Sequence, residues 1–343
     1  MKVYFKCLLV MLLSFTTLIS SSCSKDKANV PKTEAPPPAR PPGPDAEVKV
    51  WKQTEFILSS FFALPGSGNA TDYRKILNRT KAAGLNRVEL TFLSKEALEI
   101  ALNVAEEVGM RTIVQDTKSF SGVADASPAL IKSEIVARVE YLKRFSMLDG
   151  YFVWDEPFEK DFEKVKAINA ILKEADPSRL AYSVIFPSYG VYNWTAGAYT
   201  WDDNSYTRYV NGYLDQVNPE IFSFDYYPYR TNVSSVNLIE NDMWRDFGYI
   251  RKMAIAREKK LWCYIQAVNL ITGQTSIINL ERIRAQMYGA LAYGVKGLSY
   301  YNSYGSLLDD VFEKTTMYDD LTILNNDVKN IGNVLFERKA EKL

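Results

Sequence analysis

Two adjacent carboxylates, Asp155 and Glu156, are the residues of this chain best placed to do chemistry. They follow the apolar, aromatic run Tyr151–Trp154, and Pro157 comes directly after them. This pattern predicts a buried strand that presents two acids at its carboxyl end. Carboxyl groups in such a place can donate and accept protons, which is the chemistry that cleaves glycosidic bonds.

The chain contains no histidine. This excludes a Ser-His-Asp triad, histidine-bearing zinc sites and histidine as a general base. Carboxylates, tyrosines, amides or a cofactor must carry any catalysis, and we expect no cofactor and no metal. Lys plus Arg and Asp plus Glu are equal at 41 each, so the chain has no basic field for nucleic acid.

The elements that must position these acids alternate between short apolar runs and longer amphipathic stretches. Eight candidate strands are each followed by a segment of helical periodicity, which predicts a single parallel (β/α)8 barrel over residues 48–343. In such a barrel the active site lies at the carboxyl ends of the strands. An open doubly wound sheet is the alternative, but Gly66 and Gly68 lack the third glycine of a dinucleotide-binding loop. The candidate strands are Glu55–Ala63, Arg87–Leu93, Met110–Asp116, Gly150–Asp155, Leu180–Phe186, Ile221–Tyr226, Leu261–Ala267 and Gly297–Tyr301.

The predicted strand ends bring acids, amides and phenols to one pocket, which suits a neutral, polyhydroxylated ligand. Asp225 is the best candidate for a second catalytic carboxylate. The loop 187–203 is long and aromatic, and we expect its Trp194 and Trp201 to stack on sugar rings. Five further strand-end residues are expected to contact the substrate: Gln115, Tyr227, Gln266, Tyr301 and Asn302.

Here the sequence resembles a known family. The segment Trp154–Pro157 is similar to the Trp-Asn-Glu-Pro that ends strand 4 of clan A glycoside hydrolases, and Phe224–Tyr229 looks like the end of their strand 6. With Gly294–Tyr301, the chain resembles the glycosidase-like lipoproteins of gut Bacteroidetes. The resemblance implies that Glu156 is the acid/base and that Asp155 takes the place of the asparagine that contacts the sugar 2-hydroxyl.

The resemblance fails at strand 7, where clan A places its nucleophilic glutamate and this chain has Gln266. Three readings follow. In an inverting hydrolase Asp225 would activate water, with its carboxyl ~6.5–9.5 Å from that of Glu156. In a substrate-assisted N-acetylhexosaminidase-type enzyme, Asp155 and Tyr227 would hold the acetamido group of the substrate. In a catalytically silent protein the barrel would only bind glycans.

Two other acids are candidates for structural roles. Glu89 lies within the second predicted strand, and we expect it to form a buried ion pair with Arg87 or Arg111. Asp116 is left open between a structural and a functional role. Since Cys263 is the one cysteine expected to remain unmodified in the mature chain, the barrel must be stabilised without a disulfide.

The amino terminus predicts an export signal. A basic start and a short apolar stretch precede Cys23, so residues 1–22 resemble a bacterial lipoprotein signal peptide and Cys23 would carry the lipid. An ordinary cleaved signal is the alternative. The proline-rich residues 23–47 predict a stiff tether. We expect a monomer anchored to the outer membrane by its lipid alone, facing the cell exterior because of the charged segment Ser24–Lys27, or alternatively the periplasm.

Overall fold

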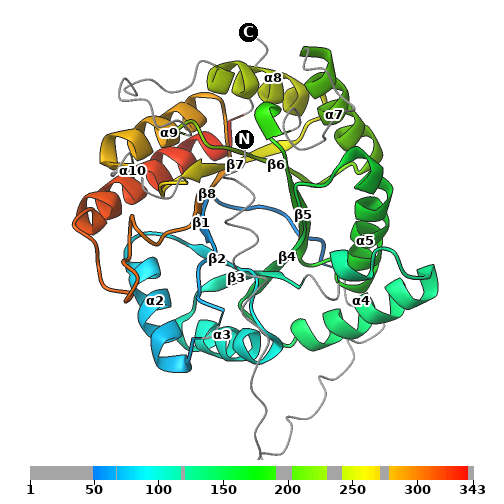
Figure 1. Cartoon of the computed structure of the whole chain (residues 1–343), viewed down its shortest axis with the longest axis horizontal. Helices are drawn as coiled ribbons and strands as arrows, with labels where there is room; N and C mark the ends of the chain where they lie inside the picture. The colour runs from blue at the N-terminus through cyan, green and yellow to red at the C-terminus, as the bar shows by residue number, and fades with distance from the viewer. Residues whose placement is uncertain are drawn as a thin grey trace, which may run out of the picture. The chain divides into compact units, whose positions relative to one another are not determined.

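The computed structural model describes residues 49–66, 68–116, 120–190, 203–229, 242–270 and 278–338. They form an α/β barrel in which eight parallel strands are surrounded by a ring of helices (Figure 1). This confirms the predicted (β/α)8 fold. Cys23, the signal and the tether lie outside the described ranges. Within those ranges, no helix combines the length and the apolar character that crossing a bilayer requires.

The strands run in one direction and follow the chain order around the barrel. Their bounds are β1 (Ile57–Phe61), β2 (Arg87–Leu90), β3 (Arg111–Gln115), β4 (Leu148–Asp155), β5 (Leu180–Ile185), β6 (Ile221–Tyr226), β7 (Lys260–Gln266) and β8 (Gly297–Tyr301). The helices are α2 (Ala70–Ala82), α3 (Lys95–Val108), α4 (Pro128–Leu142), α5 (Phe162–Ala175), α7 (Asp203–Gln216), α8 (Asp242–Ala256), α9 (Leu280–Ala292) and α10 (Tyr318–Phe336).

Capping residues set where the helices begin and end. The side chain of Asn69 accepts hydrogen bonds from the first backbone N–H groups of α2, and Ser94 does the same for α3. Gly109 ends α3 in the left-handed conformation, with φ 66°, which glycine adopts without steric penalty. Asn69 and Ser94 thus mark where α2 and α3 begin, and Gly109 separates α3 from β3.

Apolar side chains fill two concentric layers. The alternation of side chains along each strand sends one set outward to the helices and the other into the barrel. The inner set includes Phe61, Phe152, Tyr182, Trp262 and Tyr264, so the barrel interior is packed and closed. A functional pocket can therefore lie only above this packing, at one of the two ends of the barrel.

The seam between β1 and β2 is joined differently from the other strand contacts. In the described residues, parallel ladders join every neighbouring pair of strands except these two. The Asn86 N–H donates to the Leu58 carbonyl at 3.0 Å. The Asn86 side-chain amide accepts from the Leu58 N–H at 2.9 Å and donates to the Phe56 carbonyl at 2.9 Å. One residue, Asn86, thus joins the two strands through one backbone and two side-chain hydrogen bonds.

Candidate active site

The end of β4 carries the two acids that the sequence singled out. The register with β5 shifts between Phe152 and Trp154, so the strand continues past its interior aromatic residue to Asp155. Glu156 follows with φ 50°, and its N–H donates to the Val184 carbonyl at 3.0 Å. A left-handed conformation is costly for a residue other than glycine, and such strain concentrates at functional positions.

Glu156 and Asp225 form a carboxyl pair across the mouth of the barrel, from β4 to β6. The two carboxyl groups are in hydrogen-bond contact, so one proton is shared between them. Burial raises the pKa of Glu156 well above its ordinary value, and the charges of Asp225 and Asp155 raise it further. The predicted separation for an inverting pair, ~6.5–9.5 Å, requires space for a water molecule, and two carboxyl groups in contact leave none.

Asp225 is 5% exposed, and burial together with the charge of Asp155 raises its pKa to about 7. Asp155 also has a pKa raised to about 7, first by desolvation and then by the charge of Glu89. Asp155, however, is exposed at the mouth, so water that reaches its side chain weakens the effect of the surrounding protein. The three raised pKa values indicate that the cluster retains protons close to neutral pH.

Glu89 lies inside the barrel and has a different role from the one predicted. Its carboxylate accepts hydrogen bonds from the Tyr264 hydroxyl and, at 2.7 Å, from the Ser299 hydroxyl. The Tyr182 hydroxyl meets that of Tyr264 at 2.9 Å. The predicted pairing of Glu89 with Arg87 or Arg111 is wrong, because both arginines pair with Asp149. Glu89 is thus a buried acid held by hydroxyl groups, and its charge acts on Asp155.

Two phenols connect the carboxyl pair to the opposite wall of the mouth. The Tyr227 hydroxyl interacts with the carboxyl of Asp225, and the Tyr227 ring lies 4.7 Å from the ring of Tyr301. The Tyr227 N–H donates to the Tyr189 hydroxyl at 3.1 Å, which fixes the backbone after β6. Tyr227 and Tyr301 therefore belong to the same site as the acids.

The predicted amide ligands are used in different ways. The Gln266 side chain accepts from the Tyr229 N–H at 2.8 Å and donates to the carbonyls of Tyr229 and Val268, so it supports the loop after β6. The Asn302 side chain accepts from the Tyr304 N–H at 2.8 Å. Gln115 Oε1 is buried and has no hydrogen-bond partner among the described residues.

Two expectations concern other parts of the mouth. Asp116 is paired with Arg138 of α4, which indicates a structural role. Trp194 and Trp201 lie outside the described residues. The sequence placed Phe62 among the strand-end residues of the expected pocket but gave no specific function to it or to Phe92; the two follow β1 and β2. Both have positive φ values, a property that the sequence does not reveal for phenylalanine.

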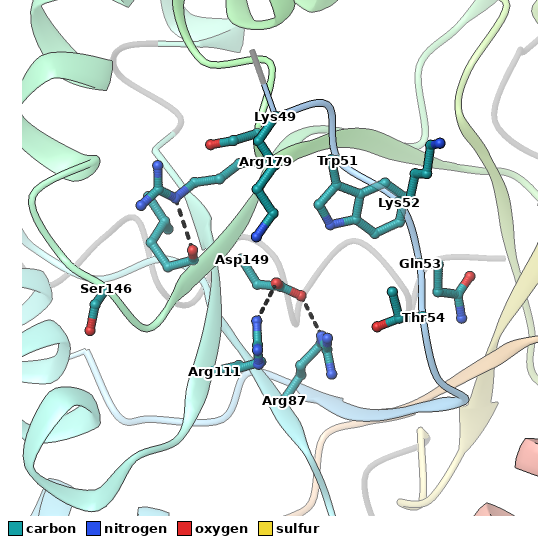
Figure 2. Close-up of a pocket in the computed structure, with 12 residues that line it drawn as sticks. Lys49, Trp51, Lys52, Gln53, Thr54, Arg87, Arg111, Ser146, Asp149 and Arg179 are labelled. Atoms are coloured by element: carbon teal, nitrogen blue, oxygen red, sulfur yellow. Dashed lines mark hydrogen bonds and ion pairs between the residues drawn. The ribbon is translucent and has the colours of Figure 1, made fainter. Parts of the chain in front are cut away.

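A pocket of about 260 Å³ lies at the amino-terminal end of the barrel, opposite the acids. Figure 2 shows Asp149 between the guanidinium groups of Arg87 and Arg111, with Lys49 and Trp51 nearby. Arg87 Nε is 2.5 Å from Asp149 Oδ2, and Arg111 is 3.0 Å from Oδ1. Because residues at the amino-terminal face of a barrel serve mainly stability, we assign this ion-pair group to structure.

The raised pKa of Asp225 predicts a stability that depends on pH. The folded state binds this proton more tightly than the unfolded state, whose aspartate pKa is about 3.9, so folding stability falls as pH rises from about 4 to 7. Asp225→Asn should therefore raise the free energy of unfolding at pH 8 by about 1–3 kcal/mol, with little gain near pH 4. Urea unfolding at several pH values measures this.

The exposed Asp215→Asn, on α7, is the control and should show no such trend. A gain for Asp225→Asn that is the same at every pH would contradict the assignment.

Comparisons with known proteins establish the kind of barrel. No family model matches the sequence, and no curated protein matches it significantly. A candidate alpha-L-fucosidase from Bacteroides thetaiotaomicron VPI-5482 superposes with a TM-score of 0.57 at 11% identity, over 86% of this chain and 100% of that protein. An endo-1,4-beta-mannanase from Rhizomucor miehei gives 0.54 at 10% identity, over 84% and 100%.

A GH2 beta-galacturonidase from Eisenbergiella tayi, solved with bound galacturonate, gives a TM-score of 0.56 at 12% identity, over 80% of this chain. The match covers 51% of that enzyme, about half its length. At these identities the similarity shows the fold alone. The chain therefore has a TIM barrel structurally similar to those of glycoside hydrolases.

Proposed function

We propose that this chain is a glycoside hydrolase in which Glu156 is the general acid. The proposal is carried by the position of Glu156 beside Asp225 at the carboxyl-terminal mouth of the barrel, where the two carboxyl groups interact and burial raises the pKa of each. A general acid must be protonated when it meets the leaving oxygen, and the raised pKa of Glu156 meets this requirement. The similarity of the barrel to those of glycosidases supports the same reaction class.

The route to the products depends on what attacks the anomeric carbon. Gln266 holds backbone groups and carries no carboxylate, so it supplies no nucleophile. The contact between Glu156 and Asp225 speaks against Asp225 as the base of an inverting mechanism, which needs a water molecule between the two groups. Substrate-assisted hydrolysis is the second candidate, because it needs one acid, a nearby orienting aspartate and a phenol. Glu156, Asp155 and Tyr227 fit these three roles.

The test is hydrolysis of a panel of aryl glycosides, aryl N-acetylhexosaminides and glycan oligosaccharides by the mature protein. Proton NMR of the first-formed anomer separates the routes: retention without a trapped sugar on Asp225 supports substrate assistance, and inversion supports attack by water. Binding without turnover across the panel would favour the third reading, a catalytically silent glycan-binding protein.

We further propose that Cys23 carries a lipid and that the barrel is held at the outer membrane, facing the exterior. The support is the sequence alone: a signal-like start before Cys23 and a proline-rich segment after it. We expect labelled palmitate to enter the wild-type protein and not Cys23→Ser. Labelling that persists in the variant would refute the assignment, and protease accessibility of intact cells distinguishes the exterior from the periplasm.

A further inference from the structure

A second group of aromatic residues lies at the mouth of the barrel, apart from the acids. Phe62 follows β1, Phe92 follows β2 and Tyr301 ends β8. The rings of Phe62 and Phe92 stack at 5.0 Å with an angle of 18° between their planes, and Phe62 meets Tyr301 edge-on at 5.8 Å. We call these three residues the aromatic wall. Phe92 is 53% exposed, so its ring is accessible to solvent.

The backbone holds the two phenylalanines in an unfavourable conformation. The φ angles are 48° at Phe62 and 57° at Phe92, in the left-handed region that bulky residues avoid. Glu156 and Asn302, which follow β4 and β8, share this conformation. Glycine at either phenylalanine position would relieve the strain but remove the ring. Strain that is retained to present an exposed side chain points to a function for that side chain.

The aromatic wall is continuous with the carboxyl pair. Tyr301 lies 4.7 Å from Tyr227, and Tyr227 interacts with Asp225. Thr91 directly precedes Phe92, and Gln115 ends β3, the strand next to β2; their side-chain oxygens, Oγ1 and Oε1, are buried and have no hydrogen-bond partner among the described residues. Thr91 is 2% exposed and Gln115 is 7% exposed. Such a combination suits a sugar, because the C–H face of a sugar ring stacks on aromatic rings and its hydroxyl groups form hydrogen bonds with polar side chains.

The carboxyl groups at the mouth favour neutral sugars over anionic ones. Four carboxyl groups lie at and below the mouth, those of Glu89, Asp155, Glu156 and Asp225. Burial raises the pKa of each, and neighbouring carboxyl groups raise the pKa of the last three further. An anionic ligand would bring a further negative charge next to any of these groups that is ionised, whereas an uncharged sugar meets no such repulsion and can accept hydrogen bonds from those that are protonated.

We propose that Phe62 and Phe92 form a stacking subsite for a neutral pyranose unit, either a hexose or an N-acetylhexosamine, next to the sugar whose bond is cut. The position of the cut rests on the proposed hydrolase activity, whereas the binding of the neutral unit does not. The subsite lies on the β1–β2 side of the mouth and the acids on the β4–β6 side, so an oligosaccharide would cross the end of the barrel.

The experiment measures binding by isothermal titration calorimetry, with the mature full chain carrying Glu156→Gln to prevent turnover. The ligands are cello-, manno- and chito-oligosaccharides from disaccharide to hexasaccharide, with oligogalacturonides as the anionic series. We expect at least one neutral series to bind. Phe92→Ala should weaken that binding about tenfold for the longer oligosaccharides and less for the disaccharide, since a stacked ring is worth about 1.4 kcal/mol.

Two variants guard against a general loss of structure. Phe92→Gly should lose the same binding while its melting temperature stays equal or rises, because glycine relieves the strain at φ 57°. Tyr288→Ala, which removes a 37% exposed ring from α9, should bind like the parent. A lowered melting temperature in Phe92→Ala and Phe92→Gly with unchanged binding would show that the ring packs on protein and would overturn the subsite.

Failure of the subsite and failure of the hydrolase proposal give different results. If Phe92 controls binding but no glycoside is hydrolysed, the subsite stands and the proposed activity fails. If hydrolysis depends on Glu156 but Phe92→Ala leaves binding and KM unchanged, the activity stands and the subsite fails. Absence of binding by every neutral series, or tighter binding of oligogalacturonides, would also overturn the subsite.

Discussion

Glu156→Gln should lower kcat by about 10²–10⁴-fold on substrates with poor leaving groups. Glutamine keeps the size of the side chain but cannot give a proton to the departing oxygen. The raised pKa of Glu156, caused by burial and by the charges of Asp225 and Asp155, keeps that proton in place at neutral pH. Activity of the wild type should therefore fall on the alkaline side, where Glu156 loses this proton.

The leaving group provides the internal control. A substrate whose leaving group is already a weak base, such as a nitrophenolate, needs little protonation, so Glu156→Gln should retain more of its rate there. Circular dichroism and melting temperature should show an intact barrel. Near-full activity of Glu156→Gln on an alkyl glycoside would remove Glu156 from the acid role.

The second large effect concerns stability at the other end of the barrel. Asp149→Ala should lower the free energy of unfolding by roughly 3–5 kcal/mol, because it leaves the buried guanidinium of Arg87 without its main partner. The Arg87 side chain is 6% exposed and that of Asp149 is 11% exposed, so water from the adjoining pocket replaces the lost pair only in part. Glu55, at 3.0 Å from Arg87, keeps part of the interaction and favours the lower end of this range.

The matched control removes the other partner of the same carboxylate. The Arg111 side chain is 54% exposed, and Arg111→Ala should therefore cost only about 0–1 kcal/mol. Urea unfolding of the mature protein measures both changes. Equal losses for the two variants would mean that burial does not set the strength of this ion-pair group.

The barrel itself was predictable because its strands are short apolar runs that stop at polar residues. The carboxyl ends of β4, β6 and β8 fall at Asp155, Tyr226 and Tyr301, as the sequence predicted. Strand starts were less certain: β4 begins at Leu148 rather than at Gly150, because Asp149 is a polar residue that the ion pair with Arg87 makes compatible with a strand.

The site was predictable only in its residue types. The contact between Glu156 and Asp225 depends on the register shift in β4 and on the positive φ of Glu156, and neither leaves a local signal in the sequence. The pairing of Glu89 was mispredicted for a related reason. Arg87 is only two residues away along β2, but Asp149 of β4 holds it at the amino-terminal end of the barrel.

The hydrogen bonds of Asn86 make the contact between β1 and β2 a place where the barrel can open locally. Between the other neighbouring strands the described residues form parallel ladders, whereas β1 and β2 can part when three hydrogen bonds of Asn86 break, one from its backbone and two from its side chain. Phe62 and Phe92 stack across the same seam, one from each side. A sugar resting on both rings would close the seam against amide hydrogen exchange, so that occupancy of the mouth and the resistance of the whole barrel to unfolding become thermodynamically linked.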